Sequence, residues 1–402
     1  MSGIYLHIPF CKQACFYCDF HFSTSLKKKD ELVSCLIKEL EIRKDELQDE
    51  TIETIYFGGG TPSLLSTDEL QSLIGAIYKN YKVIENPEIT LEANPDDLMS
   101  VRAESRTIFE DYKKVGINRL SIGIQSFFED DLKLMNRAHN AEEAKSCLSA
   151  AIGSFDNITV DLIYGIQNMT IEKWKQNLQI VFDFGINHIS SYALTVEPNT
   201  ALDSFIKSGK YPPLNEELAK QHFDVLVEET EKQGFVHYEI SNFGKTNFFS
   251  KHNTSYWKGK KYIGIGPSAH TFSKTHRSWN VANNTKYIKS ILENKLPNET
   301  EELSKNDQFN EAVMTGLRTI WGVSLAEIEA EFGSDYKNQL LASAEKFIQQ
   351  DLLVIARETK QSFNDKEITS SIPSRNDIEF LKTTKKGKFL ADGIASDLFI
   401  LN

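Results

Sequence analysis

The first half of the chain alternates between short apolar runs and longer amphipathic segments. Six runs of five to eight residues are rich in β-branched residues and lack strict polar alternation, which predicts strands buried on both faces. These candidate strands are 4–8, 54–58, 88–93, 119–124, 158–165 and 188–194. Helical spacing of apolar positions predicts helices over 29–47, 67–81, 105–115, 141–152 and 172–184. The second of these helices opens with Thr67, a residue type that caps helices.

Strands that alternate with helices indicate βαβ units and a parallel sheet, either open or curved into a barrel. Such sheets place ligand-binding residues at the carboxyl ends of their strands. We expect residues 1–205 to form this domain and 206–302 to extend it. Residues 303–402 are expected to form a small α-rich domain, in which "NDQFNEAVMTGLRTIWG" and "YKNQLLASAEKFIQQDLLVI" are amphipathic.

Composition narrows the class of protein. Hydrophobic residues are 40% and charged residues 25%, as in soluble globular proteins. No run approaches the roughly 20 apolar residues of a membrane helix, and the start lacks a signal-peptide pattern, so we expect a cytoplasmic protein. The net charge of −12 argues against nucleic acid as a partner. The basic cluster Lys382, Lys385, Lys386 and Lys388 is interpreted as a solvated loop.

Three cysteines lie close together in "CKQACFYC", on the loop after the first predicted strand. The odd total of five cysteines in a reducing compartment favours thiols or metal ligands over disulfides. Cys11, Cys15 and Cys18 could complete a tetrahedral zinc site with His7 or His21. They could equally hold a four-iron cluster and leave one iron open. Aromatic residues that would shield such a cluster surround them: Phe10, Phe16, Tyr17, Phe20 and Phe22.

Polar or glycine residues end several of the predicted strands. The run 58–60 is three glycines, which expose backbone N–H groups and let a polar ligand approach the main chain. Glu92, Gln125 and Asp161 lie in or at the end of the third, fourth and fifth strands. Ionisable groups in apolar strands are costly unless they are paired or face a ligand. Arg137 adds a cation suited to a carboxylate, so we expect a shared binding site at this edge.

A histidine and two aromatics recur in "HNTSYW" (252–257). Histidine is a common axial ligand of haem iron, and His252 is a candidate for that role, with a structural role as the alternative. The nearby "GIGPSA" resembles a dinucleotide-binding turn only weakly, because it comes late and no acidic partner follows at about 20 residues.

The spacing CxxxCxxC resembles the cluster motif of radical S-adenosylmethionine (SAM) proteins. The resemblance extends along nearly the whole chain, through "YFGGGTPS", "SIGIQSF", "VDLIYGIQ", "HNTSYW" and "GKFLADGIASDLF". It implies a partial (β/α)6 barrel with a small C-terminal α-rich domain. It also implies a [4Fe–4S] cluster on the three cysteines, whose open iron SAM chelates. The residues that would hold SAM are Tyr5, Gly59, Gly60, Thr61, Glu92, Gln125, Arg137, Asp161 and Ala193.

Within this superfamily the chain resembles the coproporphyrinogen oxidase-like group, which has two close branches. The oxygen-independent coproporphyrinogen III dehydrogenases have a fourth cysteine where this chain has Phe20, and a long segment before the cluster loop where only ten residues precede Cys11. Both departures favour the branch of HemW-type haem chaperones. That branch implies haem as a ligand, haem-acceptor proteins and an electron donor as partners, and leaves room for a homodimer and for peripheral membrane contact.

Overall fold

The computed structural model describes residues 2–99, 107–358 and 378–401. By its internal contacts the chain divides into two compact units. The first unit comprises Met1–His237, Ser241–Ser255 and Lys260–Glu301, and the second comprises Tyr238–Ile240, Tyr256–Gly259 and Glu302–Asn402. Two short segments inside the sequence of the first unit therefore belong with the second. Across the described ranges, no helix is long and apolar enough to span a lipid bilayer.

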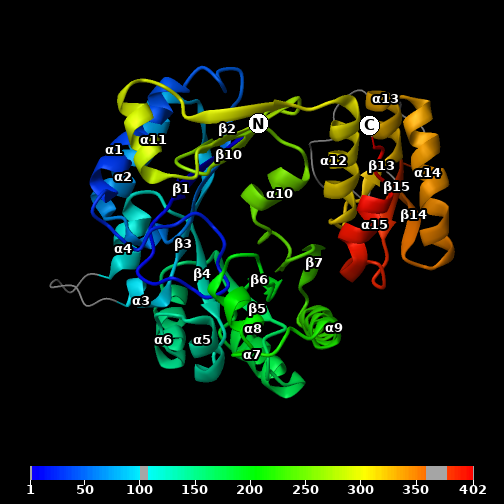
Figure 1. Ribbon diagram of the computed structural model, residues 1–402, viewed down its shortest axis with the longest axis horizontal. Helices are drawn as coiled ribbons and strands as arrows, with labels where there is room; N and C mark the ends of the chain where they lie inside the picture. Colours follow the sequence, from blue (N-terminus) through cyan, green and yellow to red (C-terminus); the bar gives the residue numbers. More distant parts are fainter. Residues whose placement is uncertain (1, 100–106, 359–377, 402) are drawn as a thin grey trace. The chain divides into compact units, whose positions relative to one another are not determined.

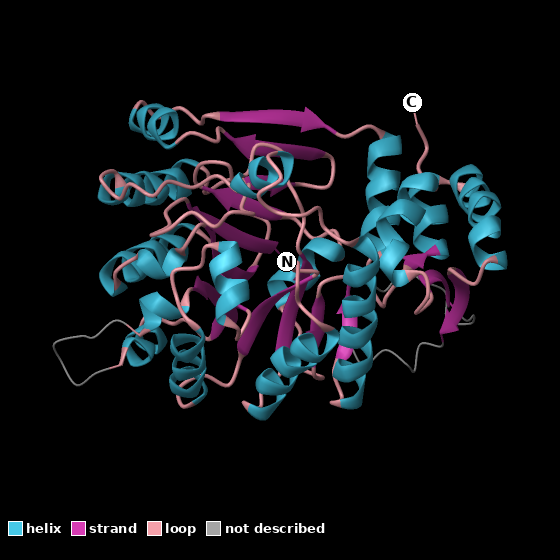
Figure 2. Ribbon diagram, turned by 60° about the horizontal axis from the view of Figure 1, so that its bottom comes forward, coloured by secondary structure: helices cyan, strands magenta, loops and turns pink. Residues whose placement is uncertain are grey.

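A sheet of twelve strands organises the first unit (Figures 1 and 2), in the order β12-β11-β10-β9-β1-β2-β3-β4-β5-β6-β8-β7. Its strands are β1 Ser2–Ile8, β2 Ile52–Gly59, β3 Val83–Ala93, β4 Arg119–Gln125, β5 Ile158–Tyr164, β6 His188–Ala193, β7 Val236–Glu239, β8 Asn242–Gly244, β9 Tyr262–Ile265, β10 His270–Phe272, β11 His276–Asn280 and β12 Asn298–Glu302. Strands β1 to β6 are parallel and neighbours in sequence order, so the predicted α/β architecture is confirmed. The sheet extends further than predicted, because β9 adds in parallel to β1 and β8 pairs antiparallel with β6.

Helices connect the strands, and those that follow the parallel strands, such as α1 and α2, cover the outer side of the sheet (Figure 1), whereas α10 packs on the other side. They are α1 Lys29–Ile42, η1 Pro62–Leu64 (a 3₁₀ turn), α2 Thr67–Asn80, α3 Pro95–Leu98, α4 Ile108–Lys114, α5 Glu129–Met135, α6 Ala141–Ile152, α7 Ile171–Asp183, α8 Ala201–Lys207, α9 Glu216–Lys232, α10 Lys251–Trp257 and α11 Asn284–Leu292. All five predicted helices exist, although positions 105 and 106 lie outside the described residues. The cap of α2 is Ser66 rather than Thr67, because Ser66 and Glu69 form a reciprocal capping box.

The two faces of the parallel sheet differ in chemistry. On β1, Ile4, Leu6 and Ile8 belong to the fully buried apolar core under the helices. The alternate residues Gly3, Tyr5 and His7 project to the opposite side, which we call the inner face. The same alternation holds on β2 and β3. Nearly all residues of β1, β4 and β5 are buried on either face, so the prediction of strands buried on both faces is confirmed, although their inner face carries polar residues. Polar groups are tolerated on the inner face because they hydrogen-bond to one another there, as described below.

The turn after β9 has a structural role in this unit. Gly266 adopts φ +105° and donates its N–H to the fully buried Glu39 of α1 at 2.8 Å. Glu39 also accepts from Arg43 at 3.2 Å and from Tyr287 of α11 at 2.6 Å. Asn280 donates to the same carboxylate at 2.8 Å. The "GIGPSA" stretch thus connects the sheet to two outer helices through a buried carboxylate.

The second unit combines helices with a three-stranded antiparallel sheet, ordered β13-β15-β14. Its elements are α12 Lys305–Leu317, β13 Val323–Ser324, α13 Leu325–Phe332, α14 Ser334–Gln349, β14 Leu353–Glu358, β15 Ile378–Thr383, η3 Lys388–Leu390 and α15 Ala391–Asp397. The last apolar residues of the second predicted helix form β14 instead, since α14 ends at Gln349 and Asp351 turns the chain at φ +59°.

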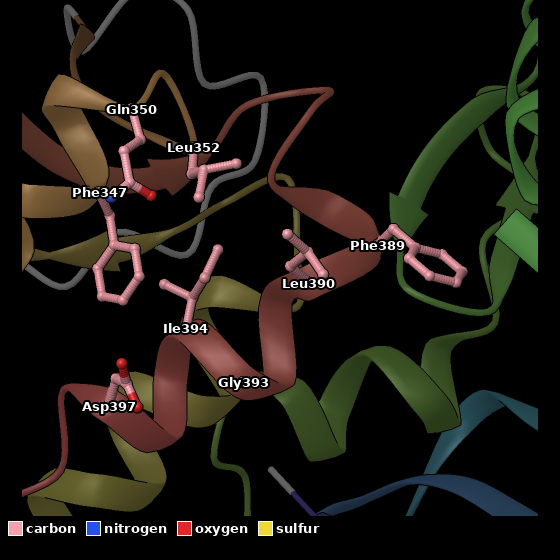
Figure 3. Close-up of a pocket in the computed structure, with 8 residues that line it drawn as sticks. All are labelled: Phe347, Gln350, Leu352, Phe389, Leu390, Gly393, Ile394 and Asp397. Carbon is pink, nitrogen blue, oxygen red and sulfur yellow. The ribbon is translucent and has the colours of Figure 1, made fainter. Parts of the chain in front are cut away.

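A cleft of about 520 Å³ opens in this unit between the end of α14 and α15 (Figure 3). Phe347, Leu352, Leu390 and Ile394 line it with apolar surface. Phe389 also contributes to its lining, although its ring points away from the other labelled side chains. The cleft is therefore mainly apolar.

Candidate functional site

The three clustered cysteines lie on the loop that joins β1 to α1. Each is half-buried, and all five cysteines of the chain are free thiols. The loop is held at its base because Cys11 donates its N–H to the carbonyl of Ser23 at 3.1 Å. Further along, Phe16 donates its N–H to the carbonyl of Met135, the last residue of α5, at 3.1 Å. The thiols are thus presented on an anchored loop at the carboxyl end of β1.

The loop also carries a charged contact. Lys12 lies 3.0 Å from the Asp96 carboxylate and pairs with Asp97, both on α3 after β3. Burial raises the pKa of the Cys11 thiol and raises that of Cys18 to about 11. Neighbouring thiolates add to both effects. Ionised thiolates at this density therefore need a nearby positive group, which a metal centre supplies.

The predicted aromatic shield is present only in part. Phe10 is fully buried, and Phe16, Tyr17 and Phe22 are half-buried. Phe20 is 67% exposed, so it does not shield a cluster as predicted. The position of the absent fourth cysteine therefore faces solvent.

Histidine ligands for a zinc ion are already engaged in hydrogen bonds. His7 uses both ring nitrogens, since Nδ1 lies 3.1 Å from the Tyr5 hydroxyl and Nε2 lies 3.0 Å from the carbonyl of His21. The Nε2 atom of His21 is 2.7 Å from the Asn284 side-chain oxygen. In the described part of the chain, no three His, Cys, Asp or Glu side chains converge as they would around one metal ion. With these histidines engaged, the three thiols supply one donor fewer than a closed zinc site requires, whereas three thiolates suffice for a four-iron cluster with one open iron.

The glycine run at the end of β2 brings two segments of the backbone close together. Gly59 has φ +110°, and a Cβ there would lie 2.7 Å from the His7 ring. A Cβ on Gly60 would lie 2.6 Å from the carbonyl oxygen of Phe10, at the base of the cysteine loop. The N–H groups, expected to face a ligand, are used internally: Gly59 donates to Glu92 at 3.2 Å and Gly60 to Ile8 at 2.9 Å. The run therefore serves close packing of the loop and strand ends.

Two carboxylates lie on the inner face, on β3 and β5, the two strands that flank β4. Glu92 accepts from the Tyr56 hydroxyl at 2.7 Å, and Asp161 accepts from Ser121 at 3.1 Å. Burial raises the pKa of Glu92 to about 7, although bonds from Tyr56 and Gly59 oppose this. Burial and the charge of Glu92 raise the pKa of Asp161 to about 7. This pair would hold a cationic ligand, because a positive group between them would relieve their repulsion.

Arg137 reaches the cysteine loop from beyond the end of α5. One terminal nitrogen lies 3.3 Å from Cys15 Sγ, and the other donates to Asn94 at 2.6 Å and to the Gly123 carbonyl at 2.8 Å. The Nε atom is buried and has no partner in the described structure. A guanidinium held by three elements beside a thiol stabilises a thiolate at that position.

Gln125 ends β4 in a strained conformation. Its φ is +66°, and the β4–β5 register shifts between Gly123 and Gln125. Such an irregularity redirects a side chain at the end of a strand and is frequent next to ligand sites. The side-chain amide lies near Arg137, since both come within 3.2 Å of the position that a Cβ of Gly123 would take.

The remaining predicted residues border the same edge. Thr61 is buried after the glycine run and accepts from Asn94 at 3.1 Å. Tyr5 is half-buried on the inner face, and Ala193 ends β6 paired with Tyr164. Tyr56 and Asn94 were missed. Asn94 follows the third strand directly, which was the available signal.

His252 lies apart from this edge, near the amino ends of β1 and β2. Its ring is 1% exposed, and Nδ1 is 2.7 Å from the Thr54 hydroxyl. Burial lowers the pKa of His252 to about 3, so the ring is neutral. A haem iron could not reach this ring without displacing the side chains packed around it.

Known protein families and relatives match this chain over most of its length. A family model described as the radical SAM superfamily matches residues 5–181, and one described as the HemN C-terminal domain matches 303–359. The heme chaperone HemW of Bacillus subtilis is 33% identical over 83% of this chain and 87% of its own length. The chain belongs to the HemW family of the radical SAM superfamily. Membership of that superfamily implies a [4Fe–4S] cluster and SAM as cofactors.

Other relatives agree with this assignment. The heme chaperone HemW of Synechocystis is 30% identical over 99% of this chain and 96% of its own length. Among solved structures, the coproporphyrinogen III oxidase HemN from Escherichia coli aligns with a TM-score of 0.80, covering 99% of this chain and 90% of that one. The sequence identity to HemN is 19%, so this likeness concerns the fold.

Proposed function

We propose that this protein is a haem chaperone that binds a [4Fe–4S] cluster, SAM and haem, and that delivers haem to acceptor proteins. The observation that carries the proposal is the anchored loop with three free thiols, which contacts Arg137 through Cys15 and has Phe20 in the fourth position. The curated relatives over most of the chain carry the name heme chaperone HemW, which supports haem as the ligand.

The cluster would be held by Cys11, Cys15 and Cys18. Three thiolates leave one iron of a four-iron cluster open, and SAM would occupy it through its amino and carboxylate groups. Arg137 would stabilise the thiolate of Cys15, to which it already donates at 3.3 Å. A reduced cluster supplies one electron to bound SAM, and an external electron donor would provide it.

SAM would lie along the carboxyl ends of β1 to β6. The carboxyl groups of Glu92 and Asp161 suit its positive charge, because a cation beside them would favour their ionised forms and relieve the repulsion that Glu92 exerts on Asp161. The strained Gln125 and the guanidinium of Arg137 would add polar contacts. The rest of the proposed SAM set borders this edge: Tyr5, Gly59, Gly60, Thr61 and Ala193.

We propose that the protein binds haem, but we assign no residue as the ligand of the haem iron. His252 is enclosed by its neighbours. The apolar cleft of the second unit has eight lining residues, and none of them is a histidine, cysteine or methionine. Haem would then be held chiefly by its macrocycle and propionates, which suits a protein that must release it again.

Anaerobic reconstitution followed by titration with SAM and then haem in one cuvette tests the proposal. We expect about four irons per chain, a SAM-dependent change in the EPR signal of the reduced cluster, and a saturable Soret shift. A colourless protein with one zinc per chain would contradict the cluster assignment. Absence of a saturable Soret shift would contradict haem binding and leave the cluster result standing.

The alternative function is an oxygen-independent coproporphyrinogen III dehydrogenase, and the shared fold with HemN is what favours it. Incubation of the reconstituted protein with coproporphyrinogen III, SAM and a reductant decides between the two. We expect no protoporphyrinogen. Turnover above that of a protein lacking Cys15 would establish the dehydrogenase and refute a purely chaperone role.

A further inference from the structure

The histidine of "HNTSYW" has no part in the cluster or SAM site proposed above, yet it is enclosed on every side. It belongs to α10, which lies on the opposite side of the sheet from α1 and α2 (Figure 1). The register aligns Gly3 of β1 with Thr54 of β2, and Thr54 with Glu88 of β3. These three residues form the first row of the inner face, and His252 packs directly on that row.

Hydrogen bonds lock the histidine to this row. Thr54 bonds to its Nδ1 at 2.7 Å. Glu88, itself buried, accepts the backbone N–H groups of His252 at 3.0 Å and Lys251 at 3.1 Å, and so satisfies the start of α10. Gly3 leaves room for the ring, because a Cβ there would lie 3.2 Å from its Cε1 and Nδ1 atoms.

The next row of the inner face rests on the histidine. Tyr5 and Tyr56 are register partners, with ring centroids 6.1 Å apart. The His252 ring stacks on Tyr56 at 4.8 Å with an interplanar angle of 24°, and lies 6.5 Å from Tyr5. Tyr56 in turn donates its hydroxyl to Glu92 at 2.7 Å. One continuous line of contacts therefore runs from Thr54 through His252 and Tyr56 to the carboxylate.

We propose that His252 is a positioning residue, whose ring supports Tyr56 from below and keeps the Tyr56 hydroxyl on Glu92. The inference rests on the proposed function to the extent that Glu92 is taken to contact SAM. The His252 ring is fixed by its hydrogen bond to Thr54, and a fixed flat ring limits how far the Tyr56 ring stacked on it can tilt. A tyrosine without that support has other rotamers available, and the carboxylate loses its fixed partner.

Two replacements of His252 distinguish support of the Tyr56 ring from ligation of haem iron. His252→Phe keeps a flat ring under Tyr56, whereas His252→Ala removes it. In the reconstituted protein we expect His252→Ala to weaken SAM binding about tenfold, equivalent to about 1.4 kcal/mol, and His252→Phe to stay within about threefold of the unchanged chain. Both variants are expected to keep the haem Soret shift.

A second readout is independent of the cofactors. In protein labelled with ¹³C-tyrosine, the Tyr56 ring resonances are identified by their loss in Tyr56→Phe. Stacking under a histidine shifts these resonances, so His252→Ala should move them towards values of unstacked tyrosine. Gly3→Ala would place a methyl group 3.2 Å from the His252 ring and should move these resonances as well, without removing the histidine.

Phe109→Ala is the matched control for loss of a buried ring. Phe109 lies on α4, in the core under the outer face, and makes an edge-to-face contact with Phe155 rather than with the inner-face residues. It should lower stability and leave SAM affinity and the Tyr56 resonances unchanged.

Three outcomes would overturn the inference. The first is that His252→Ala and His252→Phe bind SAM with equal affinity. The second is that His252→Ala leaves the Tyr56 resonances unchanged. The third is a Soret shift lost in both variants but kept in Phe109→Ala, which would make His252 a haem ligand. If the unchanged chain binds no SAM, the proposed function fails, while the Tyr56 resonances still decide the role of His252.

Discussion

Replacement of Glu92 by glutamine should make the folded protein more stable relative to the unchanged chain as the pH rises. The carboxylate lies on the inner face, where it accepts from Tyr56 at 2.7 Å and from the Gly59 N–H at 3.2 Å. Glutamine has nearly the same shape and can keep the bond from Tyr56, so the main change is the loss of an ionisable group.

The magnitude follows from the pKa of Glu92, which burial raises from 4.5 to about 7 in the folded protein. Below pH 4.5 both folded and unfolded chains hold the proton, and the group adds no pH dependence. Between that pH and about 7, only the folded chain holds it, so stability falls as pH rises. A tenfold change in an ionisation constant is worth about 1.4 kcal/mol, which makes the total loss about 3 kcal/mol.

Urea unfolding of the metal-free protein at pH 5 and pH 8, under anaerobic reducing conditions, measures this effect. We expect Glu92→Gln to gain stability relative to the unchanged chain by about 2 to 3 kcal/mol between the two pH values. The charge of Glu92 is one cause of the raised pKa of Asp161. Removing that charge also lowers the pKa of Asp161, which adds to the gain in stability. Glu142→Gln, on the exposed side of α6, is the control. A difference between Glu92→Gln and the unchanged chain that does not vary with pH would refute the reasoning.

Three further changes test other parts of the structure. Arg137→Gln should lower the midpoint potential of the reconstituted cluster by about 60 mV, since it removes a charge-assisted bond to Cys15 Sγ; an unchanged potential at full iron content in an EPR-monitored titration would contradict this. Cys15→Ala should lose the cluster iron. Cys147→Ala, in the core, should keep the iron, and its free energy of unfolding in urea should fall by about 1 to 2 kcal/mol. Equal iron contents in the two variants would count against the cluster assignment. Glu39→Gln removes one of the two carboxylates that pair with the buried Arg43, Glu46 being the other, and should cost about 2 kcal/mol of stability. A melting temperature within a degree of the unchanged chain would show that the charge of Glu39 is not needed there.

Much of the site was predictable because its signals are local in sequence. The spacing of Cys11, Cys15 and Cys18 depends on one loop, and the strands that carry Glu92 and Asp161 were recognisable from their apolar runs. Parallel strands bring their carboxyl ends to one edge, so the sequence was enough to expect these residues near one another. The strands β7 to β12 were largely missed, because they are short and are defined by partners distant in the chain.

The sequence alone determined the order of the six parallel strands and the helices between them, the loop of three thiols and the family resemblance, because each depends on residue type and spacing. Only the tertiary structure decided which strand residues share the inner face, and that the polar ones satisfy one another there. It also placed Arg137 beside Cys15 and turned Phe20 to solvent. His252 is the clearest case: its motif indicated a ligand, but contacts with Thr54, Glu88 and Tyr56, up to 198 residues away in sequence, enclose it. Such contacts come from strand register and helix placement, which no local pattern encodes.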